Sequence, residues 1–582
     1  MQDSMTISTP LAAESSGTLA LNQKRVIILG LAAICSMLVL NTFCRVFYTG
    51  DEAFYSVTAL NMLHSPTYIL RPSFFPDGDF LADKDGYAQP PLNSYFLAIP
   101  LWLSGGVIAS QEIVNVLAFA LLLYCGYRLL SLFDSQAAGL AVLLLATSPM
   151  IVFCYGILEA EPVMTTFGIA ALYLAFRGGF QRGQKRWLYA GAICIGFAFA
   201  LKLWLSGPLA LAVLVALVVR ASQAQIKLRW KALHLVLFGL VALIPAATHI
   251  LAVACTYPQD LPFWFKNIYF GVFTSSGISG TKMTGEGIDS NWIHPFWYYG
   301  PLLYRDHFFL APIFLFGIGS ILRDKSVKRE LLCALLAGAG GLVVLSGIKV
   351  KEFLYVLTCV TFIYLLAAVV LASLLRRLAQ DGEVDPFSRR LGYFGTSGLI
   401  AVFLAAYALH IQPDKITRGF IIGHTVTQLL ILSFFWWATH HRGLRLQRVL
   451  YAAAAAFVAV AFCYRAYTRQ PRDKMISNII QPYVQNNSPQ ALSLIGSNFR
   501  SFQFFTFRRG CYWQEVPLAE GPEKIMAKPE YRSVHAFIID LKEETKPEIS
   551  AWVRWLESHA TEKTGELDSH LRSPSDFRIF VR

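Results

Sequence analysis

The sequence predicts a polytopic all-α membrane protein of about thirteen transmembrane helices, followed by a small soluble α/β domain. Two observations indicate this class. The 582 residues are 55% hydrophobic and 15% charged, and a mean hydropathy of +0.48 excludes a water-soluble enzyme. The apolar residues also fall in repeated blocks of about 20, each bounded by charge and long enough to cross a bilayer core of about 30 Å as a helix.

The first apolar block lies at about residues 26–46, directly after Lys24 and Arg25. No small-residue cleavage site stands out before Asp51, so we expect a retained helix rather than a removed signal peptide. Residues 1–25 are then a cytoplasmic N-terminal segment. Further spans are expected at about residues 111–130, 136–155, 162–177, 187–204, 206–220, 232–254, 307–322, 330–348, 353–374, 392–410, 419–438 and 448–466.

The net charge of +13 is spread over several loops and forms no single basic patch, which argues against a nucleic-acid partner. The basic loops follow the even-numbered spans, so we expect them in the cytoplasm and the C-terminus outside. Their charge is an orientation signal that also favours anionic headgroups. The residues concerned are Arg177, Arg182, Lys185, Arg186, Arg220, Lys227, Arg229, Lys231, Arg323, Lys325, Lys328, Arg329, Arg376, Arg377, Arg389, Arg390, Arg442, Arg445 and Arg448.

Two outward loops are long, at about residues 47–110 and 255–306. The first is rich in aspartate and ends in an apolar stretch with prolines and glycines, at 91–107. We expect that stretch to lie as a helix on the outer membrane face.

The transmembrane region at 26–466 is followed by the expected outward domain at 467–582. The ten cysteines form no CxxC pair, and this domain holds only Cys511, so neither an internal disulfide nor a zinc framework is expected there. The predicted elements are strands at Leu492–Ile495, Ala536–Leu541 and Phe577–Val581 and a helix at Ile549–His559.

Two acidic features lie at the outer ends of spans. Asp51 and Glu52 follow the first span, where adjacent acids are commonly surface charge alone. The alternative is that one carboxylate faces a site as a base or cation ligand while its neighbour orients it. Glu161 precedes Pro162 between the third and fourth spans, where the simpler interpretation is an interfacial turn. A carboxylate that sinks toward the bilayer centre costs on the order of 3 kcal/mol, which favours a site.

Lysines and aromatic residues occur at the same outer junctions. Lys202, near the outer end of the fifth span, can simply extend its ammonium to the headgroups. Lys349 and Lys351 break the positive-inside rule, and a cation at an outer membrane rim is a natural partner for a lipid phosphate. An aromatic cluster at 291–301 most often indicates an interfacial belt, within which His294 alone is more commonly structural. Taken together, these segments predict a site that faces the outer leaflet.

In their order, these motifs resemble a known family, the GT-C polyprenyl-phosphate-sugar glycosyltransferases, which include the protein mannosyltransferases and the lipid A aminoarabinose transferase. The resemblance covers about residues 26–375 in motif order. The motifs are Asp51-Glu52, Gln89-Pro90-Pro91-Leu92, Glu161-Pro162, Lys202 through Gly207-Pro208-Leu209-Ala210, His294-Pro295-Phe296-Trp297-Tyr298-Tyr299, and Lys351 with Tyr355.

The resemblance implies transfer of a sugar from an undecaprenyl-phosphate-type donor to a lipid, glycan or protein acceptor at the periplasmic face of a bacterial inner membrane. Direct displacement at the anomeric carbon would invert its configuration. The roles it implies are a catalytic one for Asp51, Glu52 and Glu161, phosphate binding for Lys202, Lys351, Tyr355 and Lys84, and a substrate pocket that includes Gln89, His294, Tyr298 and Tyr299.

One run departs from the family. The aminoarabinose transferases carry Glu-Lys-Pro-Pro, in which the glutamate binds a metal, whereas this chain has Ala88-Gln89-Pro90-Pro91. A divalent metal and aminoarabinose as the sugar are therefore left unassigned.

Two other function classes stay open. A polytopic transporter or flippase for a lipid-linked sugar also uses aromatic clusters and buried acids, but it needs access from both faces. An outward-facing sensor would use the C-terminal domain for its ligand, but it leaves the two long outer loops unexplained. The unusual ionisable residues gather at one outer rim, which favours the glycosyltransferase.

Overall fold

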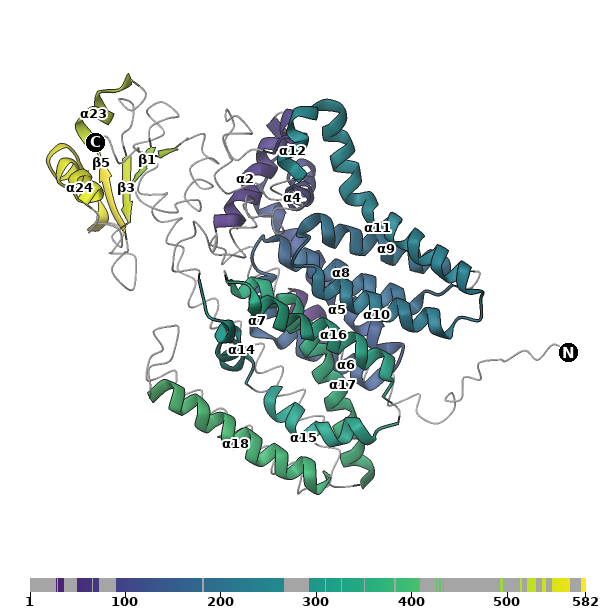
Figure 1. Ribbon diagram of the computed structural model, residues 1–582. Helices are drawn as coiled ribbons and strands as arrows, with labels where there is room; N and C mark the ends of the chain where they lie inside the picture. Colours follow the sequence, from purple (N-terminus) through teal and green to yellow (C-terminus); the bar gives the residue numbers. More distant parts are fainter. Residues whose placement is uncertain are drawn as a thin grey trace. The chain divides into compact units, whose positions relative to one another are not determined.

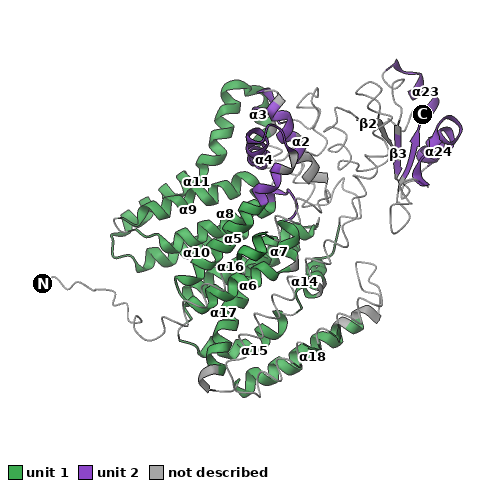
Figure 2. Cartoon of the chain, turned by 180° about the vertical axis from the view of Figure 1, so that it is seen from behind, with its two compact units in different colours: residues 1–37, 116–155, 161–461 green, residues 38–115, 156–160, 462–582 purple. Residues whose placement is uncertain are grey.

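The protein, in a computed structural model, comprises two compact units (Figure 2). Unit 1 comprises residues 1–37, 116–155 and 161–461, and unit 2 comprises residues 38–115, 156–160 and 462–582. The residues described are 28, 30–35, 50–64, 66–72, 91–180, 183–265, 293–308, 310–325, 327–349, 351–381, 384–408, 425–426, 429–430, 433, 492–495, 513–515, 521–529, 536–540, 547–565 and 577–582.

The described part of unit 1 consists mainly of helices, several of which pack against α17 (Leu357–Asp381) (Figure 1). This helix contacts α6, α15 and α16, and almost all of its side chains are buried. The long helix α11 (Leu228–Thr256) packs against α9 and exposes Leu240 and Leu251 elsewhere, as expected of a helix that faces lipid. The other helices are α5 (Glu112–Ser131), α6 (Ser135–Thr147), α7 (Pro149–Cys154), α8 (Ala160–Arg177), α9 (Lys185–Leu201), α10 (Gly207–Gln223), α12 (Leu261–Phe263), α14 (Tyr299–His307), α15 (Leu310–Arg323), α16 (Arg329–Gly347) and α18 (Pro386–Ala408).

Within the described residues, four helices are long and apolar enough to cross a bilayer: Glu112–Ser131, Leu228–Thr256, Arg329–Gly347 and Phe353–Leu378. All four coincide with predicted spans. The helices α8, α9, α10, α15 and α18 also lie at predicted positions. The last two predicted spans lie almost wholly outside the described residues, so the total of about thirteen stays a prediction.

One predicted span is interrupted. The segment at 136–155 was expected to be one helix, but it forms α6 and α7 with a break at Ser148. Pro149 disfavours the helical conformation at the residue before it, and Ser148 accordingly has ψ of 117°. The Ser148 hydroxyl oxygen accepts a hydrogen bond from the Ile151 backbone N–H at 3.3 Å, which caps the second helix.

The first long outward loop contains more helix than expected. Asp51 and Glu52 lie in the first turn of α2 (Gly50–His64), where negative charge is favoured by the helix dipole. Tyr55, Ala59 and Met62 are buried at helical spacing, and this periodicity stabilises the element. The predicted apolar stretch at 91–107 is confirmed as the helix α4 (Leu92–Leu103), which packs against α2. The helix α3 (Thr67–Leu70) and the 3-10 turn η2 (Ile108–Gln111) complete this part of unit 2.

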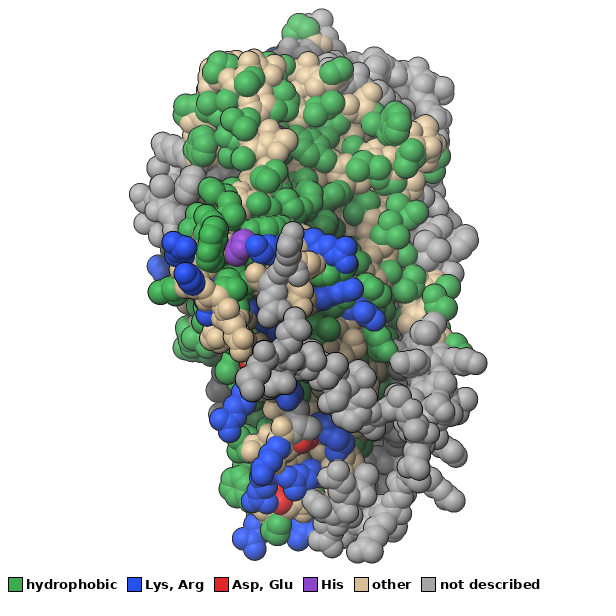
Figure 3. Space-filling view, turned by 90° about the vertical axis from the view of Figure 1, so that its right-hand side faces the viewer, with side chains coloured by type: hydrophobic (Ala, Val, Ile, Leu, Met, Phe, Trp, Pro, Cys, Tyr) green, Lys and Arg blue, Asp and Glu red, His purple; other side chains and the backbone are tan. Residues whose placement is uncertain are grey.

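The basic loops gather at one end of unit 1. Figure 3 shows lysine and arginine side chains concentrated on that face. Side-chain bonds tie neighbouring elements together there: for example, the Arg220 guanidinium donates to the Gly178 carbonyl at 3.1 Å, and Arg376 pairs with Asp324 at 2.9 Å. The starts of α8, α10 and α17 and the ends of α9 and α16 lie at the opposite end, because consecutive helices run antiparallel.

The described C-terminal residues form a five-stranded sheet in the order β2-β1-β3-β5-β4. β1 pairs in parallel with β2 and β3, and β5 pairs antiparallel with β3 and β4. Trp552 and Leu556 pack against the sheet at Phe537 and Phe580. The three predicted strands and the predicted helix are confirmed as elements, whereas the short β2 and β4 were not predicted. The elements are β1 (Leu492–Ile495), β2 (Trp513–Glu515), α23 (Pro522–Ala527), β3 (Ala536–Asp540), α24 (Pro547–His559), β4 (Thr561–Glu562) and β5 (Phe577–Val581).

Candidate functional site

A buried ion pair joins α8 to the end of α9. The Lys202 Nζ lies 2.6 Å from the Glu161 Oε1, and the two side chains are 6% and 1% exposed. Glu161 stands in the first turn of α8, and Lys202 follows the last residue of α9 with extended backbone. The start of one helix and the end of the next, antiparallel helix are neighbours, which brings these two residues together across 41 positions of sequence.

The second carboxylate oxygen of Glu161 has no hydrogen-bond partner among the described residues. This oxygen, Oε2, is buried. An unsatisfied buried carboxylate oxygen costs free energy, so a ligand that offers a hydroxyl or amine proton is favoured there.

A second buried lysine, Lys351, has no counter-charge within the part of the chain that the structure describes. Its Nζ donates to the backbone carbonyl of His294 at 2.9 Å and to that of Ile348, and the residue is 2% exposed. Burial lowers the pKa of this ammonium below the usual range of lysine. An ammonium has three N–H donors, so one is left for an anion.

The aromatic segment is tied to the same junction. The His294 backbone N–H donates to the Lys349 carbonyl at 3.0 Å, and the His294 ring stacks on Tyr298 with centroids 3.9 Å apart. The Tyr299 hydroxyl donates to the Glu352 carbonyl at 3.1 Å. These contacts, through 3-10 turn η7 (Phe296–Tyr298), hold the segment beside Lys351.

A ring contact of Tyr355 joins the segments that carry the two lysines. Tyr355 lies in the 3-10 turn η8 (Phe353–Val356), one turn after Lys351, and its ring meets that of Trp204 edge-on at 4.9 Å. Trp204 in turn follows Lys202 by two residues. The predicted residues Glu161, Lys202, His294, Tyr298, Tyr299, Lys351 and Tyr355 therefore gather at the end of unit 1 opposite the basic loops.

Four predicted site residues are not placed in this group. Asp51 and Glu52 belong to unit 2, and their backbone alone is described. Lys84 and Gln89 lie outside the described residues. Their roles stay predictions.

Hydroxyl groups that the sequence did not single out hold the site elements together. The Thr165 and Thr358 hydroxyls lie 2.8 Å apart and join α8 to α17, one turn beyond Glu161 and Tyr355. The Tyr155 hydroxyl donates to the Pro162 carbonyl at 2.9 Å, next to Glu161. Polar residues inside apolar spans are the signal that would have indicated them.

The glutamate that binds a metal in the family resemblance is replaced in this sequence by Ala88. Ala88-Gln89 supplies a neutral amide where a hard divalent cation prefers a carboxylate. Within the described residues, no group of three or more His, Cys, Asp or Glu side chains is arranged to hold a metal ion. We therefore assign no step to a metal.

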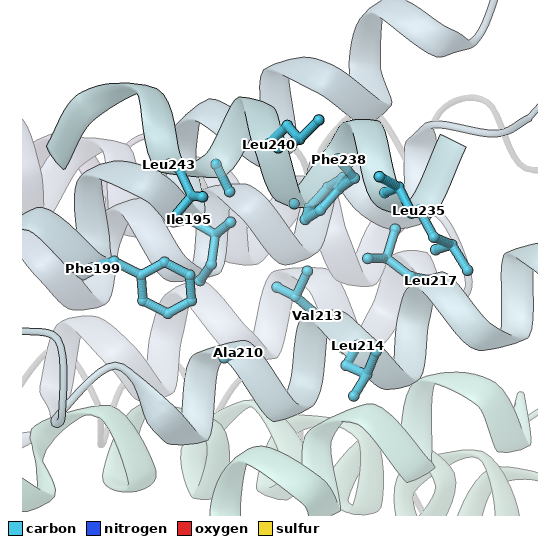
Figure 4. Close-up of a pocket in the computed structure, with 13 residues that line it drawn as sticks. Ile195, Phe199, Ala210, Val213, Leu214, Leu217, Leu235, Phe238, Leu240 and Leu243 are labelled. Atoms are coloured by element: carbon cyan, nitrogen blue, oxygen red, sulfur yellow. The ribbon is translucent and has the colours of Figure 1, made fainter. Parts of the chain in front are cut away.

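An apolar groove of about 640 Å³ lies between α9, α10 and α11 (Figure 4). Its walls include Ile195, Val213 and Phe238. Phe199, at one end, precedes Lys202 by three residues. The groove thus runs along the membrane-facing helices from the neighbourhood of the ion pair.

Comparisons with known proteins agree with this architecture. The sequence model of the dolichyl-phosphate-mannose-protein mannosyltransferase family matches residues 88–249. A search of curated protein sequences gave no match. The crystal structure of ArnT from Cupriavidus metallidurans bound to undecaprenyl phosphate superposes with a TM-score of 0.60 at 15% identity, over 97% of this chain and 98% of that one. The apo structure of the same protein gives 0.60 and 15%, over 95% and 97%.

The family match includes Glu161 and Lys202, and the structural match extends over nearly the whole of both chains. At 15% identity the structural match establishes the fold. The chain therefore has the fold of ArnT, and its resemblance to the GT-C glycosyltransferases is confirmed.

Proposed function

We propose that the protein is an integral membrane glycosyltransferase that moves a sugar from a polyprenyl-phosphate-linked donor to a lipid, glycan or protein acceptor. The observation that carries this proposal is Lys351, a buried ammonium whose partners among the described residues are backbone carbonyls. A buried cation without a counter-anion is costly, and a phosphate ligand supplies the missing charge.

The same cation suits the chemistry. When the bond from the anomeric carbon to the phosphate breaks, negative charge grows on the departing phosphate oxygen. A preorganised ammonium in a water-poor site stabilises that charge more in the transition state than in the ground state. The polyprenyl phosphate then leaves as an anion without a general acid.

Lys202 has a different place in this scheme. Glu161 already compensates its charge at 2.6 Å, so a phosphate would have to compete with the carboxylate. We assign the pair to sugar orientation, with the open Glu161 Oε2 accepting a hydrogen bond from the donor sugar.

The acceptor step is carried over from the family resemblance. Asp51, with Glu52 beside it, is the proposed base for a hydroxyl acceptor. If the acceptor is a phosphate, which is already ionised, the carboxylate orients it instead. Attack from the face opposite the leaving phosphate inverts the anomeric configuration.

The remaining features support a lipid-linked donor and one orientation. The groove beside α9 offers an apolar surface for the isoprenoid tail, with its Phe199 end near Lys202. The basic end of unit 1 marks the cytoplasmic side by the positive-inside rule, so the site opens toward the periplasm of a bacterial inner membrane.

The test is donor binding by matched lysine variants. Lys351→Ala should weaken binding of undecaprenyl phosphate to the purified protein about ten- to a hundredfold, the range expected for a charge-assisted bond. Lys349→Ala, two residues away but exposed, should change it less than about twofold. Equal losses in both variants, or an equal effect of Lys351→Ala on acceptor affinity, would contradict the phosphate role.

A further inference from the structure

The chain between α7 and α8 is buried but not helical. Residues 156–160 are all buried, and the backbone is irregular up to Ala160. Buried carbonyl groups outside a helix need hydrogen-bond donors from elsewhere, because neither lipid nor apolar side chains supply them.

Two asparagines supply those donors from two different elements. The Asn115 Nδ2, in α5, donates to the Ile157 carbonyl. The Asn93 Nδ2, in α4, donates to the Leu158 carbonyl at 3.4 Å. Both side chains are 1% exposed. Two successive carbonyls are thus held from two helices, which fixes both the position and the rotation of the peptide that joins them.

A third amide strengthens the arrangement. One turn before Asn115, the Gln111 Nε2 donates to the Ser56 carbonyl at 3.3 Å, so the start of α5 is also tied to α2. All of these contacts lie within unit 2.

The held segment leads directly into the candidate site. Glu159 follows Leu158 and is 1% exposed. The next residue begins α8, whose first turn carries Glu161. Because both carboxylates follow Leu158 within three residues, we expect a change of the peptide plane at Leu158 to displace them, and a displacement of about 1 Å can cost two orders of magnitude in rate.

The amides are not explained by stability alone. The Oδ1 of Asn93 is buried and has no hydrogen-bond partner among the described residues. Burying that oxygen costs free energy that an apolar side chain would avoid. Asn93 nevertheless stands at this position, where its amide donates to the Leu158 carbonyl.

We propose that Asn93 and Asn115 are positioning residues, which act through the backbone at Ile157 and Leu158 to place Glu159 and Glu161 for sugar transfer. This inference rests on the proposed function. Neither asparagine touches substrate in the scheme, and each acts only through the carbonyl that it holds.

The test uses full-length protein in detergent or nanodiscs. Asn115→Asp keeps the size of the side chain but replaces the donor with an acceptor, and it should lower kcat about ten- to a hundredfold while the donor KM changes less than about twofold. The matched control is Thr361→Val, which removes a buried hydroxyl that donates to the Leu357 carbonyl within its own helix at 2.9 Å. It should leave kcat unchanged even where the melting temperature falls.

Two further readouts separate positioning from stability. In a Glu161→Asp background, Asn115→Asp should lower kcat less than it does in the wild type, because both changes act on one group. Hydrogen–deuterium exchange of a peptide that covers 155–163 should rise in Asn115→Asp and not in Thr361→Val. If Asn115→Asp does not fold, Asn93→Ser, which loses only the 3.4 Å bond, replaces it.

The outcomes are distinguishable. Unchanged exchange and unchanged kcat in the asparagine variants, with transfer lost in Glu161→Gln, would overturn the positioning role alone. Fully additive losses of kcat in the Glu161→Asp/Asn115→Asp double variant would also overturn the positioning role. Suppose that hydrogen–deuterium exchange rises in Asn115→Asp but the wild-type protein transfers no sugar. This result would support the role of the asparagines in holding the backbone at Ile157 and Leu158, and it would contradict the proposed function.

Discussion

Two buried lysines at one end of unit 1 differ in how their charge is compensated. Lys202 has a carboxylate at 2.6 Å, whereas Lys351 has backbone carbonyls as its partners among the described residues. The first arrangement is electrically neutral before any substrate arrives, and the second is complete only with an anion. On this difference we base the proposal that Lys202 helps to orient the sugar and that Lys351 binds the phosphate.

Removing only one charge of the Glu161–Lys202 pair should lower the free energy of unfolding more than removing both. Glu161→Gln leaves a buried ammonium uncompensated and should destabilise the protein by about 3–5 kcal/mol. The double variant Glu161→Gln/Lys202→Met removes both charges and should be more stable than Glu161→Gln alone. Thermal unfolding in detergent measures both. Additive losses in the double variant would show that the two charges do not interact.

The lowered pKa of Lys351 gives the protein a defined pH dependence. Phosphate binding needs the charged ammonium, so donor affinity should fall as the pH rises through this lowered pKa. Stability should change in the opposite direction, because between the folded and unfolded pKa values the unfolded chain binds more protons and folding is favoured by rising pH. Lys351→Arg keeps its charge at high pH and should lose this dependence of donor affinity. Parallel pH profiles in the two proteins would contradict the assignment.

The sequence predicted individual site residues, but it did not predict which residues they contact. Glu161 and Lys202 stood out as charges at membrane junctions, but their pairing depends on how α8 and α9 pack. Asn93 and Asn115 did not stand out, because an amide in an apolar stretch is informative only when the carbonyl that it meets is known.

Among the elements, the close approach of α16 to α17 is set by a glycine. A Cβ at Gly338 would lie 2.3 Å from the ring of Phe362, whereas at Gly340, on the same helix, nothing lies within 4 Å. The lack of a side chain at the first position allows α17 to pack tightly beneath the site.

This contrast predicts a matched pair of variants. Gly338→Ala should destabilise the protein by about 1–3 kcal/mol through overpacking. Gly340→Ala should be neutral or stabilise it by about 0.5–1 kcal/mol, because alanine loses less backbone entropy in a helix. Melting temperatures of the two variants measure the difference. Similar values for both would mean that α16 and α17 are not packed at this distance.

Hydropathy predicted the positions of most described helices. The position of the break between α6 and α7 depends instead on the backbone preferences of single residues. The break at Ser148 follows from Pro149, and a proline inside an apolar block is visible in the sequence. Helix α2 was harder to predict, since its sequence is polar at the start and its stabilising contacts come from packing against α4.

For the whole molecule, the separation of charge along unit 1 predicts its orientation in a membrane. The basic loops gather at one end and the two buried lysines at the other, which follows from the alternating direction of the helices. The positions of the charged residues relative to the apolar spans predicted this arrangement. The grouping of residues 38–115 with the C-terminal residues in unit 2 was not predicted, because it depends on long-range contacts.

The orientation of the protein in the membrane can be measured with one cysteine introduced at either end of unit 1. Lys325→Cys, in an exposed basic loop, should react with a membrane-impermeant thiol reagent only in inverted vesicles. Lys349→Cys, exposed at the other end, should react only in intact spheroplasts. The unsubstituted chain corrects for the native cysteines. Labelling of both positions from the same side would contradict the proposed topology.

The most direct test of sugar transfer is mass spectrometry of membrane lipids, surface glycans and exported proteins from cells that carry the wild-type chain, lack it, or carry Asp51→Asn. Cells of the last two kinds should lose the same sugar from one acceptor and accumulate the polyprenyl-phosphate-linked sugar, while the variant inserts normally. Full modification of the acceptor in the Asp51→Asn cells would contradict a catalytic role for that carboxylate. An unchanged set of glycosylated species in the cells without the chain would contradict the glycosyltransferase itself.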